Sequence, residues 1–230
     1  MANSHAEKAC APQAHAQSLF VQNKWALPFA ILAGIFIVSI RFTPYPLSYA
    51  VKALPILLLL FLALRTAPFR GRLGLMAAIF FSACGDVILD LNFKGAFIAG
   101  LASFLTAHVC YVVVFALHFR LQKKMLAVSL AGIVLPAAMA VFLWPHLGEL
   151  KLPVAVYVTA IASMFLTSVN RSNINSSLIF GAMFFLISDS VLALNKFYAP
   201  IPAARYAIMA TYYLAQYLIV TGLTDEQGTD

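Results

Sequence analysis

The sequence contains little charge: only 15 Lys and Arg and 8 Asp and Glu occur among 230 residues. Its residues are 63% hydrophobic and 10% charged, whereas an average soluble domain is roughly 45–50% apolar and about 25% charged. So few charges would leave much apolar side-chain area in water, which excludes a water-soluble globular fold. An aromatic content of 13% also excludes an intrinsically disordered chain. The composition therefore predicts a helical membrane domain.

Cysteine and histidine are also scarce. Of the three cysteines, Cys10 lies in a polar tail, and Cys84 and Cys110 lie within apolar runs, so neither a disulfide framework nor a zinc cluster is expected. The five histidines form no His-x-x-His or His-x-x-x-His pair, and no Gly-x-Ser-x-Gly, Walker or Rossmann motif occurs. We therefore expect no metal and no cofactor, which leaves any chemistry to carboxylates.

Eight apolar segments follow a polar N-terminal tail of residues 1–23. They cover roughly 25–41, 47–65, 73–91, 95–118, 124–144, 152–169, 176–194 and 203–222. A helix of about 18–20 residues spans roughly 27–30 Å, which matches the hydrocarbon core of a bilayer. We predict an all-α, polytopic membrane protein with about eight transmembrane helices over 24–223 and an acidic tail over 224–230. A bacterial inner membrane and a eukaryotic endomembrane both fit this composition.

The distribution of Lys and Arg among the loops predicts the orientation. One side of the predicted bundle carries nine of these residues and the other side five, so the positive-inside rule places both termini in the cytoplasm. The net charge of +7 comes from the scarcity of acids and indicates no nucleic-acid partner. An internal similarity links the runs that begin at Gly85 and Ser188, each at the end of the third span of a four-span half. It suggests a 4+4 repeat.

The acidic residues identify the first candidate site. Five of the eight lie in tails or a loop, which leaves Asp86, Asp90 and Asp189 within spans, where a carboxylate is costly and is a functional candidate. Asp86 and Asp189 each lie 13 residues past the start of a span, and the two spans run in the same direction. They are expected at one depth, where they either share a water-filled pocket or separately fix helix packing. Asp90 is expected to be a solvated acid at a helix end, with participation in the site as the second interpretation.

Three cations are expected near the aspartates, toward the outer face. Lys52 lies about 7 Å below that face, where it either snorkels to the interface or neutralises an aspartate or a lipid phosphate. Lys196 and Arg205 flank the connection between the last two spans. Together with Lys52 they form a cationic rim suited to a phosphate head group, although such residues also serve simply as anchors.

Polar side chains of the fourth and eighth spans complete the candidates. His108 is expected nearer the cytoplasm than the aspartates, and a structural hydrogen bond to another helix is favoured over contact with a substrate. Side chains halfway through the last span can bond a carboxylate, a substrate oxygen or a neighbouring helix. The candidate substrate-binding residues are Lys52, His108, Tyr111, Asn195, Lys196, Arg205, Tyr212, Tyr213 and Gln216.

Several motifs, in this order and at this spacing, resemble the lysoplasmalogenase, or YhhN-like, family of membrane proteins. The resemblance runs from about residue 47 to residue 222 and is most specific in the last two spans. It rests on Lys with Pro in 52–58, Cys-Gly-Asp around Asp86, His-Val-Cys-Tyr at 108–111, Phe-Phe-Leu-Ile-Ser-Asp-Ser-Val-Leu-Ala-Leu-Asn-Lys-Phe at 184–197 and Ile-Met-Ala-Thr-Tyr-Tyr-Leu-Ala-Gln at 208–216.

The resemblance implies eight transmembrane helices and hydrolysis of the vinyl-ether bond of lysoplasmalogens. The products would be a fatty aldehyde and glycerophosphocholine or glycerophosphoethanolamine. The family's paired catalytic aspartates correspond to Asp86 and Asp189, whereas Asp90 is outside its pattern. One protonated carboxyl group would deliver a proton to the vinyl carbon, and a carboxylate would stabilise the resulting cation and activate water. Which aspartate plays which part stays open.

Two other functions remain as alternatives. A proton-coupled transporter of lipids or small molecules would use the same aspartates as a relay, but all three acids lie toward one face of the membrane. A structural membrane protein would leave two aspartates at one depth unexplained. The hydrolase hypothesis implies a lysophospholipid substrate and the lipid bilayer as partners, and it leaves head-group preference and oligomeric state undetermined.

Overall fold

The structure is a computed structural model that describes residues 25–66, 69–91 and 93–225. Within this part of the chain, eight helices are long and apolar enough to cross a membrane. They are Trp25–Phe42, α2 (Ser48–Arg65), α3 (Arg72–Asp90), α4 (Ala96–Ala116), α5 (Leu126–Leu143), α6 (Lys151–Val169), α7 (Ser176–Phe197) and α8 (Ala204–Asp225). The described residues include no strand, only an isolated bridge between Phe119 and Arg171.

The eight predicted spans are confirmed, and every predicted boundary lies within three residues of the observed one. The largest differences are at the ends of α7 and α8, which each continue three residues beyond the prediction. The polar residues Asn195 and Lys196 marked an end of the apolar run, yet the helix continues through them. The predicted N-terminal tail, and residues 226–230 of the C-terminal one, lie outside the described residues.

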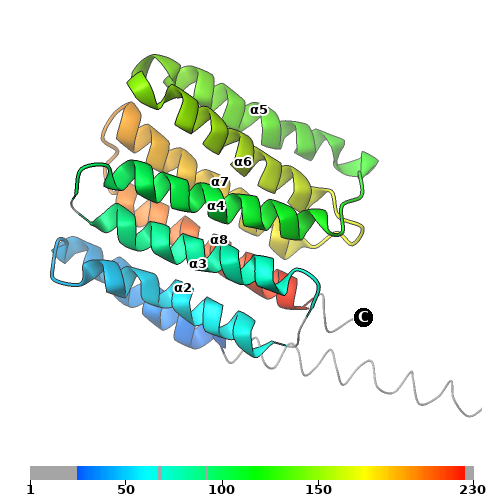
Figure 1. The fold of residues 1–230 in the computed structure, drawn as a ribbon, viewed down its shortest axis with the longest axis horizontal. Helices are drawn as coiled ribbons and strands as arrows, with labels where there is room; N and C mark the ends of the chain where they lie inside the picture. The colour runs from blue at the N-terminus through cyan, green and yellow to red at the C-terminus, as the bar shows by residue number, and fades with distance from the viewer. Residues whose placement is uncertain (1–24, 67–68, 92, 226–230) are drawn as a thin grey trace, which may run out of the picture.

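Successive helices run antiparallel, so the two ends of the described chain lie at the same end of the bundle (Figure 1). The connections α3–α4, α5–α6 and α7–α8 lie at the opposite end, which we call the distal end (Figure 1). Because the described chain crosses the bundle eight times, an even number, its two ends must lie at the same end of the bundle. The assignment of the distal end to the outer side of the membrane stays a prediction from the loop charges.

Six of the helices form a closed ring in which each contacts the next, in the order α2, α3, α4, α6, α7, α8 and back to α2. α5 packs outside this ring on α6 and α7, at one edge of the bundle in Figure 1. The first span packs outside it at α2 and α8, through Trp25 on Phe61 and Phe29 on Tyr213. A shift of four helices reproduces the same ring order, and the 4+4 repeat itself stays a prediction from the sequence.

Small residues permit close approach of helices beside the candidate residues. A Cβ atom on Gly85, next to Asp86, would lie 2.6 Å from the ring of Phe104 on α4. A Cβ on Gly181 of α7 would lie 2.7 Å from Ile219 of α8. The interior of the ring is filled by aromatic side chains, with Phe185 in edge contact with Phe104, His108 and Tyr212. The protein is an integral, multi-pass membrane protein with a tightly packed centre.

Candidate active site

A polar cavity of about 960 Å³, including its open mouth, lies at the distal end of the ring. It is enclosed by α2, α3, α4, α7 and α8, so it joins segments that are far apart in the sequence. Both Asp86 and Asp189 line it, which is the arrangement that their equal predicted depth favoured. Its polar and charged lining residues are Lys52, Asp86, Asp90, Ser188, Asp189, Asn195, Lys196, Arg205 and Tyr212.

Asp86 of α3 is 2% exposed and has partners for both carboxylate oxygens. Tyr212 Oη of α8 donates a 2.7 Å hydrogen bond to Oδ2, and Lys52 Nζ of α2 lies 3.5 Å from Oδ1. Lys52 also donates to the backbone oxygen of Asp86 at 3.2 Å. A buried carboxylate needs a nearby cation and hydrogen-bond donors, and Asp86 has both.

Lys52 and Asp90 form the centre of an ion-pair network. Lys52 Nζ lies 3.2 Å from Asp90 Oδ1, and Arg205 donates to Asp90 Oδ2 at 2.7 Å. Asp90 is the last residue of α3, as expected, but its side chain is only 11% exposed, so the expectation of a solvated acid is wrong. Both of its carboxylate oxygens are paired, with two cations that the sequence placed on a rim. Lys52 is 5% exposed, so the counter-charge interpretation describes it better than snorkelling.

Asp189 of α7 is held by a tyrosine and a histidine from two other helices. Tyr157 of α6 donates to Asp189 Oδ2 at 2.6 Å, and His108 Nε2 of α4 lies 3.2 Å from the same oxygen and 3.0 Å from Tyr157 Oη. Among the described residues, none bonds to Oδ1 of Asp189. The side chain of Asp189 is 15% exposed. It lines both this polar cavity and an adjoining apolar cavity. Both donors fix one carboxyl oxygen, so the other is available to a bound molecule.

The hydrogen bonds also indicate which ring nitrogen of His108 donates. Tyr157 gives its only proton to Asp189, so His108 contributes favourably with hydrogen on Nε2. His108 Nδ1 is buried and has no partner among the described residues.

The side chains of His108 and Asp189 meet although the backbone of His108 lies farther from the distal end than that of Asp189. Side chains lean toward the N-terminus of their own helix. Since α4 and α7 are antiparallel, the imidazole of His108 leans toward the distal end and the carboxyl group of Asp189 leans away from it. Two backbone positions at different depths thus bring their side chains together.

The two aspartates have equivalent supports with different chemistry. Asp86 is bonded from α2 and α8, and Asp189 is bonded from α6 and α4. A shift of four helices relates α2 to α6 and α4 to α8. The helices that support one aspartate therefore correspond to those that support the other. Asp86 faces the ammonium of Lys52, whereas Asp189 faces the hydroxyl of Tyr157 and the imidazole of His108. One carboxyl group therefore faces a lysine and the other does not.

Two further predicted residues line the cavity in different ways. Lys196 lies at its mouth with Nζ 4.9 Å from the centre of the Phe97 ring, and it has no carboxylate partner among the described residues. Asn195 also lines the cavity, but its Oδ1 accepts a 2.9 Å hydrogen bond from the backbone of Ile201. Asn195 thus holds the connection between α7 and α8. Of the three predicted cations, Lys196 is the one left for an anionic group.

Besides His108, three predicted residues lie outside the lining of the cavity. Tyr111 donates to Gln216 Oε1 at 2.6 Å, and both side chains are buried between α4 and α8. Tyr213 donates to the backbone oxygen of Lys52 at 2.7 Å. These hydrogen bonds join helices, the alternative that the sequence left open. Direct contact of Tyr111, Tyr213 or Gln216 with a substrate in this cavity is not supported by their positions.

The sequence did not single out Tyr157, although its hydroxyl makes the shortest hydrogen bond to Asp189. Its signal is weak, because one tyrosine in an apolar span is usually a packing residue. Ser188 was also missed as a lining residue, and its hydroxyl donates to the backbone of Ile208 on α8. The only hint for Tyr157 comes from the predicted repeat. It relates α2, which supplies Lys52 to Asp86, to α6, which supplies Tyr157 to Asp189.

Cysteine and metal-binding groups contribute nothing recognisable to the site. Cys84 and Cys110 are unpaired, and Cys10 lies outside the described residues. Within 25–66, 69–91 and 93–225, no group of three or more His, Cys, Asp or Glu side chains is arranged to hold a metal ion. The chemical groups available in the cavity are carboxyl, ammonium, guanidinium and hydroxyl groups.

The fold and the cavity define a class: multi-pass helical membrane proteins with two aspartates that line one cavity at one end of the bundle. Residues 47–223 match the model of the YhhN family, and the chain belongs to this family. It is similar to a Sus scrofa protein named lysoplasmalogenase TMEM86B, with 34% identity over 90% of this chain and 89% of the relative. It is also similar to a Homo sapiens protein named lysoplasmalogenase TMEM86A, with 32% identity over 80% of this chain and 81% of the relative. A Mycobacterium bovis protein named lysoplasmalogenase is 32% identical over 66% of this chain and 61% of its own length. No solved structure matches the chain.

Proposed function

We propose that this protein is a lysoplasmalogenase, an integral membrane hydrolase that cleaves the vinyl-ether bond of lysoplasmalogens. Its products are a fatty aldehyde and glycerophosphocholine or glycerophosphoethanolamine. One observation carries the proposal at the level of chemistry: two aspartates line one cavity, one opposite a lysine ammonium and the other held by a tyrosine and a histidine. Membership of the YhhN family and the names of its relatives support the same activity.

The different partners of the aspartates suggest a division of roles. The ammonium of Lys52 and the hydroxyl of Tyr212 offset part of the cost of a buried charge on Asp86. Asp189 has no lysine or arginine beside it among the described residues and borders apolar surface, where a charge is costly. His108 and Tyr157 occupy its Oδ2, so a proton on Oδ1 would face the bound substrate. Asp189 is thus the proposed acid, and Asp86 is the proposed base.

The first step is protonation at carbon. The proton of Asp189 passes to the second carbon of the alkenyl chain, where the π electrons of the double bond form the new C–H bond. The positive charge is left on the first carbon and the ether oxygen as an oxocarbenium ion. The carboxylate of Asp86 stabilises this cation. A water molecule then adds to the first carbon and gives a proton to Asp86, which yields a hemiacetal.

The second step releases the products. The bond between the first carbon and the glycerol oxygen breaks, the hemiacetal hydroxyl becomes the aldehyde carbonyl, and the glycerol oxygen takes up a proton. Transfer of the remaining proton from Asp86 to Asp189 through water restores the starting state. One water molecule is consumed and no oxidant or metal enters the balance. The sequence of acid and base roles parallels that of paired carboxylates in glycoside hydrolysis.

The charges at the mouth of the cavity suit the phosphodiester of the head group. Lys52 and Arg205 are already paired with Asp90, whereas Lys196 lacks a carboxylate partner among the described residues. An ammonium group is a good point-charge partner for phosphate. We place the head group at the mouth near Lys196, with the ether bond deeper in the cavity between the aspartates.

Aldehyde release by purified protein in detergent tests this proposal. Wild type should release aldehyde from lysoplasmenylethanolamine, and Asp86→Asn and Asp189→Asn should each lose nearly all turnover. Glu149→Gln is the matched control, because it neutralises an exposed loop acid and should keep wild-type activity. The hydrolase proposal fails if wild type releases no aldehyde. The assignment of the aspartates fails if either asparagine variant retains near-normal turnover.

A further inference from the structure

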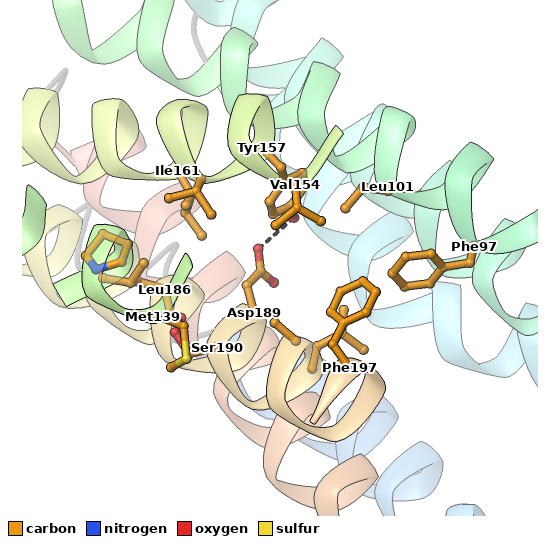
Figure 2. Close-up of a pocket in the computed structure, with 14 residues that line it drawn as sticks. Phe97, Leu101, Met139, Val154, Tyr157, Ile161, Leu186, Asp189, Ser190 and Phe197 are labelled. Atoms are coloured by element: carbon orange, nitrogen blue, oxygen red, sulfur yellow. Dashed lines mark hydrogen bonds between the residues drawn. The ribbon is translucent and has the colours of Figure 1, made fainter. Parts of the chain in front are cut away.

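A second cavity, of about 570 Å³, lies beside the polar one and is almost entirely apolar. It is enclosed by α4, α5, α6 and α7, and its only polar side chains are Tyr157, Asp189 and Ser190. In Figure 2 the carboxyl group of Asp189 lies at its middle, directed toward Tyr157, with Ile161 and Leu186 to one side. Aromatic side chains lie on the other side, toward the distal end. The apolar cavity is thus built around the proposed acid.

The two cavities adjoin each other. Phe97, Asp189 and Leu192 line both of them, so the polar and the apolar space meet at these three side chains. Asp189 is the only ionisable residue among the shared three. A molecule that occupies both cavities must therefore cross from polar to apolar surroundings next to its carboxyl group.

The apolar cavity continues toward the opposite end of the bundle. Val158 of α6 lines it and also lines a groove of about 550 Å³ between α5 and α6, whose lining extends to Leu166. Eight residues of helix place Leu166 about 12 Å farther from the distal end than Val158. Ile133, on the α5 wall of this groove, is 42% exposed, so the groove faces the lipid. The two hydroxyl groups in the groove, of Thr159 and Ser163, are bonded to the backbone of α6 itself. A largely apolar path therefore leads from Asp189 along α5 and α6 into the hydrocarbon region.

We propose that the apolar cavity and this groove hold the alkenyl chain of the substrate, an inference that rests on the proposed function. A lysoplasmalogen changes from polar to apolar at its vinyl-ether bond, and the structure makes the same change at Asp189. The path also keeps the lipid in its usual orientation, with its head group at the membrane face and its chain directed inward. The carbon that accepts the proton lies on the chain side of the ether oxygen, which is the side that Asp189 faces.

The proposal makes Val158 a determinant of chain length, because it stands where the cavity joins the groove. Val158→Phe adds bulk at this junction. Val156→Phe, two residues away on the same helix, adds the same bulk on a side chain that is 46% exposed and outside both cavities. A detergent micelle is as apolar as the groove, so the free energy of a long chain changes little when it enters the groove. We therefore expect Val158→Phe to act by sterically excluding long chains from the groove.

Competition between a short-chain and a long-chain lysoplasmenylethanolamine in one mixed micelle measures this exclusion. Val158→Phe should lower the ratio of long-chain to short-chain kcat/KM by roughly tenfold or more relative to wild type, which is the scale of overpacking a filled space. Val156→Phe should keep the wild-type ratio. If Val158→Phe also keeps that ratio while turning over substrate, the chain lies elsewhere. If wild type releases no aldehyde from either substrate, the proposed function itself fails.

A binding experiment tests the same proposal without turnover and without Val158→Phe. The probe is a lysophospholipid with a saturated 1-alkyl ether, which has no vinyl bond to hydrolyse, and a diazirine at the end of its chain. After illumination of the wild-type protein, adducts are expected on α5 and α6 between Ile133 and Leu166, and unlabelled lysoplasmalogen should compete for them. Competed adducts confined to the first span, α2 or α3 would overturn the proposal.

Discussion

The most informative perturbation of the site is removal of the Lys52 charge. Lys52→Met keeps a side chain of similar length but leaves Asp86 and Asp90 without the ammonium that lies 3.5 Å and 3.2 Å from them. Asp90 still has Arg205, whose side chain is 41% exposed and able to follow it. Asp86, which is 2% exposed, keeps only the hydroxyl of Tyr212. The variant therefore isolates one deeply buried carboxylate.

The expected cost follows from these distances. Unit charges about 3.5 Å apart attract each other by roughly 5 kcal/mol at an effective dielectric constant of about 20. Removal of one partner from a buried ion pair costs about 3–5 kcal/mol in proteins. We expect Lys52→Met to lower the free energy of unfolding by about 3–5 kcal/mol. In a soluble protein of this size that loss lowers Tm by roughly 6 °C or more.

Thermal unfolding of the purified protein in detergent, followed by intrinsic fluorescence, measures this loss. Lys94→Met is the matched control, because Lys94 is an exposed loop residue, and its removal should change stability by no more than about 0.5 kcal/mol. Addition of Asp90→Asn to Lys52→Met should recover part of the lost stability. The double variant has only one carboxylate, that of Asp86, where the single variant has two without the lysine ammonium. The coupling between the two substitutions is expected at roughly 0.5–3 kcal/mol.

The reasoning is refuted if Lys52→Met is as stable as wild type, or if Asp90→Asn adds its own cost to that of Lys52→Met without any recovery. Either result would mean that Lys52 does not neutralise these carboxylates. Turnover by the variant that carries both substitutions is a second readout. It should stay well below wild type, because Asp86 still lacks its counter-charge even where stability is restored.

Three further predictions concern binding, positioning and packing, and one concerns orientation. Lys196→Gln should raise KM with little change in kcat, because it removes the proposed phosphate partner. His108→Phe keeps the ring but removes the donor to Asp189, so kcat should fall by about ten- to a hundredfold at nearly constant KM. Tyr111→Phe should cost about 1–3 kcal/mol in unfolding measurements, because it unpairs a buried amide, and leave KM unchanged. In a cysteine-free background, an impermeant thiol reagent should label Arg70→Cys from the cytoplasmic side and Tyr198→Cys from the other.

The sequence predicted the helices well because the bilayer imposes one length and one composition on each span. It also predicted that Asp86 and Asp189 share a site, since two residues equally far into parallel spans must lie at one depth. Depth is a one-dimensional property, and the position of a residue along an apolar run determines it directly.

Lateral neighbours were harder to predict. The ion pair of Lys52 with Asp90 depends on α2 lying beside α3, and the contact of His108 with Asp189 depends on the opposite lean of side chains on antiparallel helices. Tyr157 was invisible because nothing in the sixth span distinguishes a tyrosine that holds a carboxyl group from one that packs. The same limit applied to Tyr111 and Tyr213, which resemble site residues in sequence but join helices in the structure.

Hydrolysis in heavy water tests the central claim most directly, because that claim is proton transfer from Asp189 to carbon. After wild type acts on lysoplasmenylethanolamine, mass spectrometry should find one deuterium on the aldehyde carbon next to the carbonyl group. In water labelled with heavy oxygen, the glycerophosphoethanolamine should carry no label, because its oxygen never leaves the glycerol. Asp189→Asn should form neither product. An aldehyde without deuterium, or label in the glycerophosphoethanolamine, would contradict the mechanism.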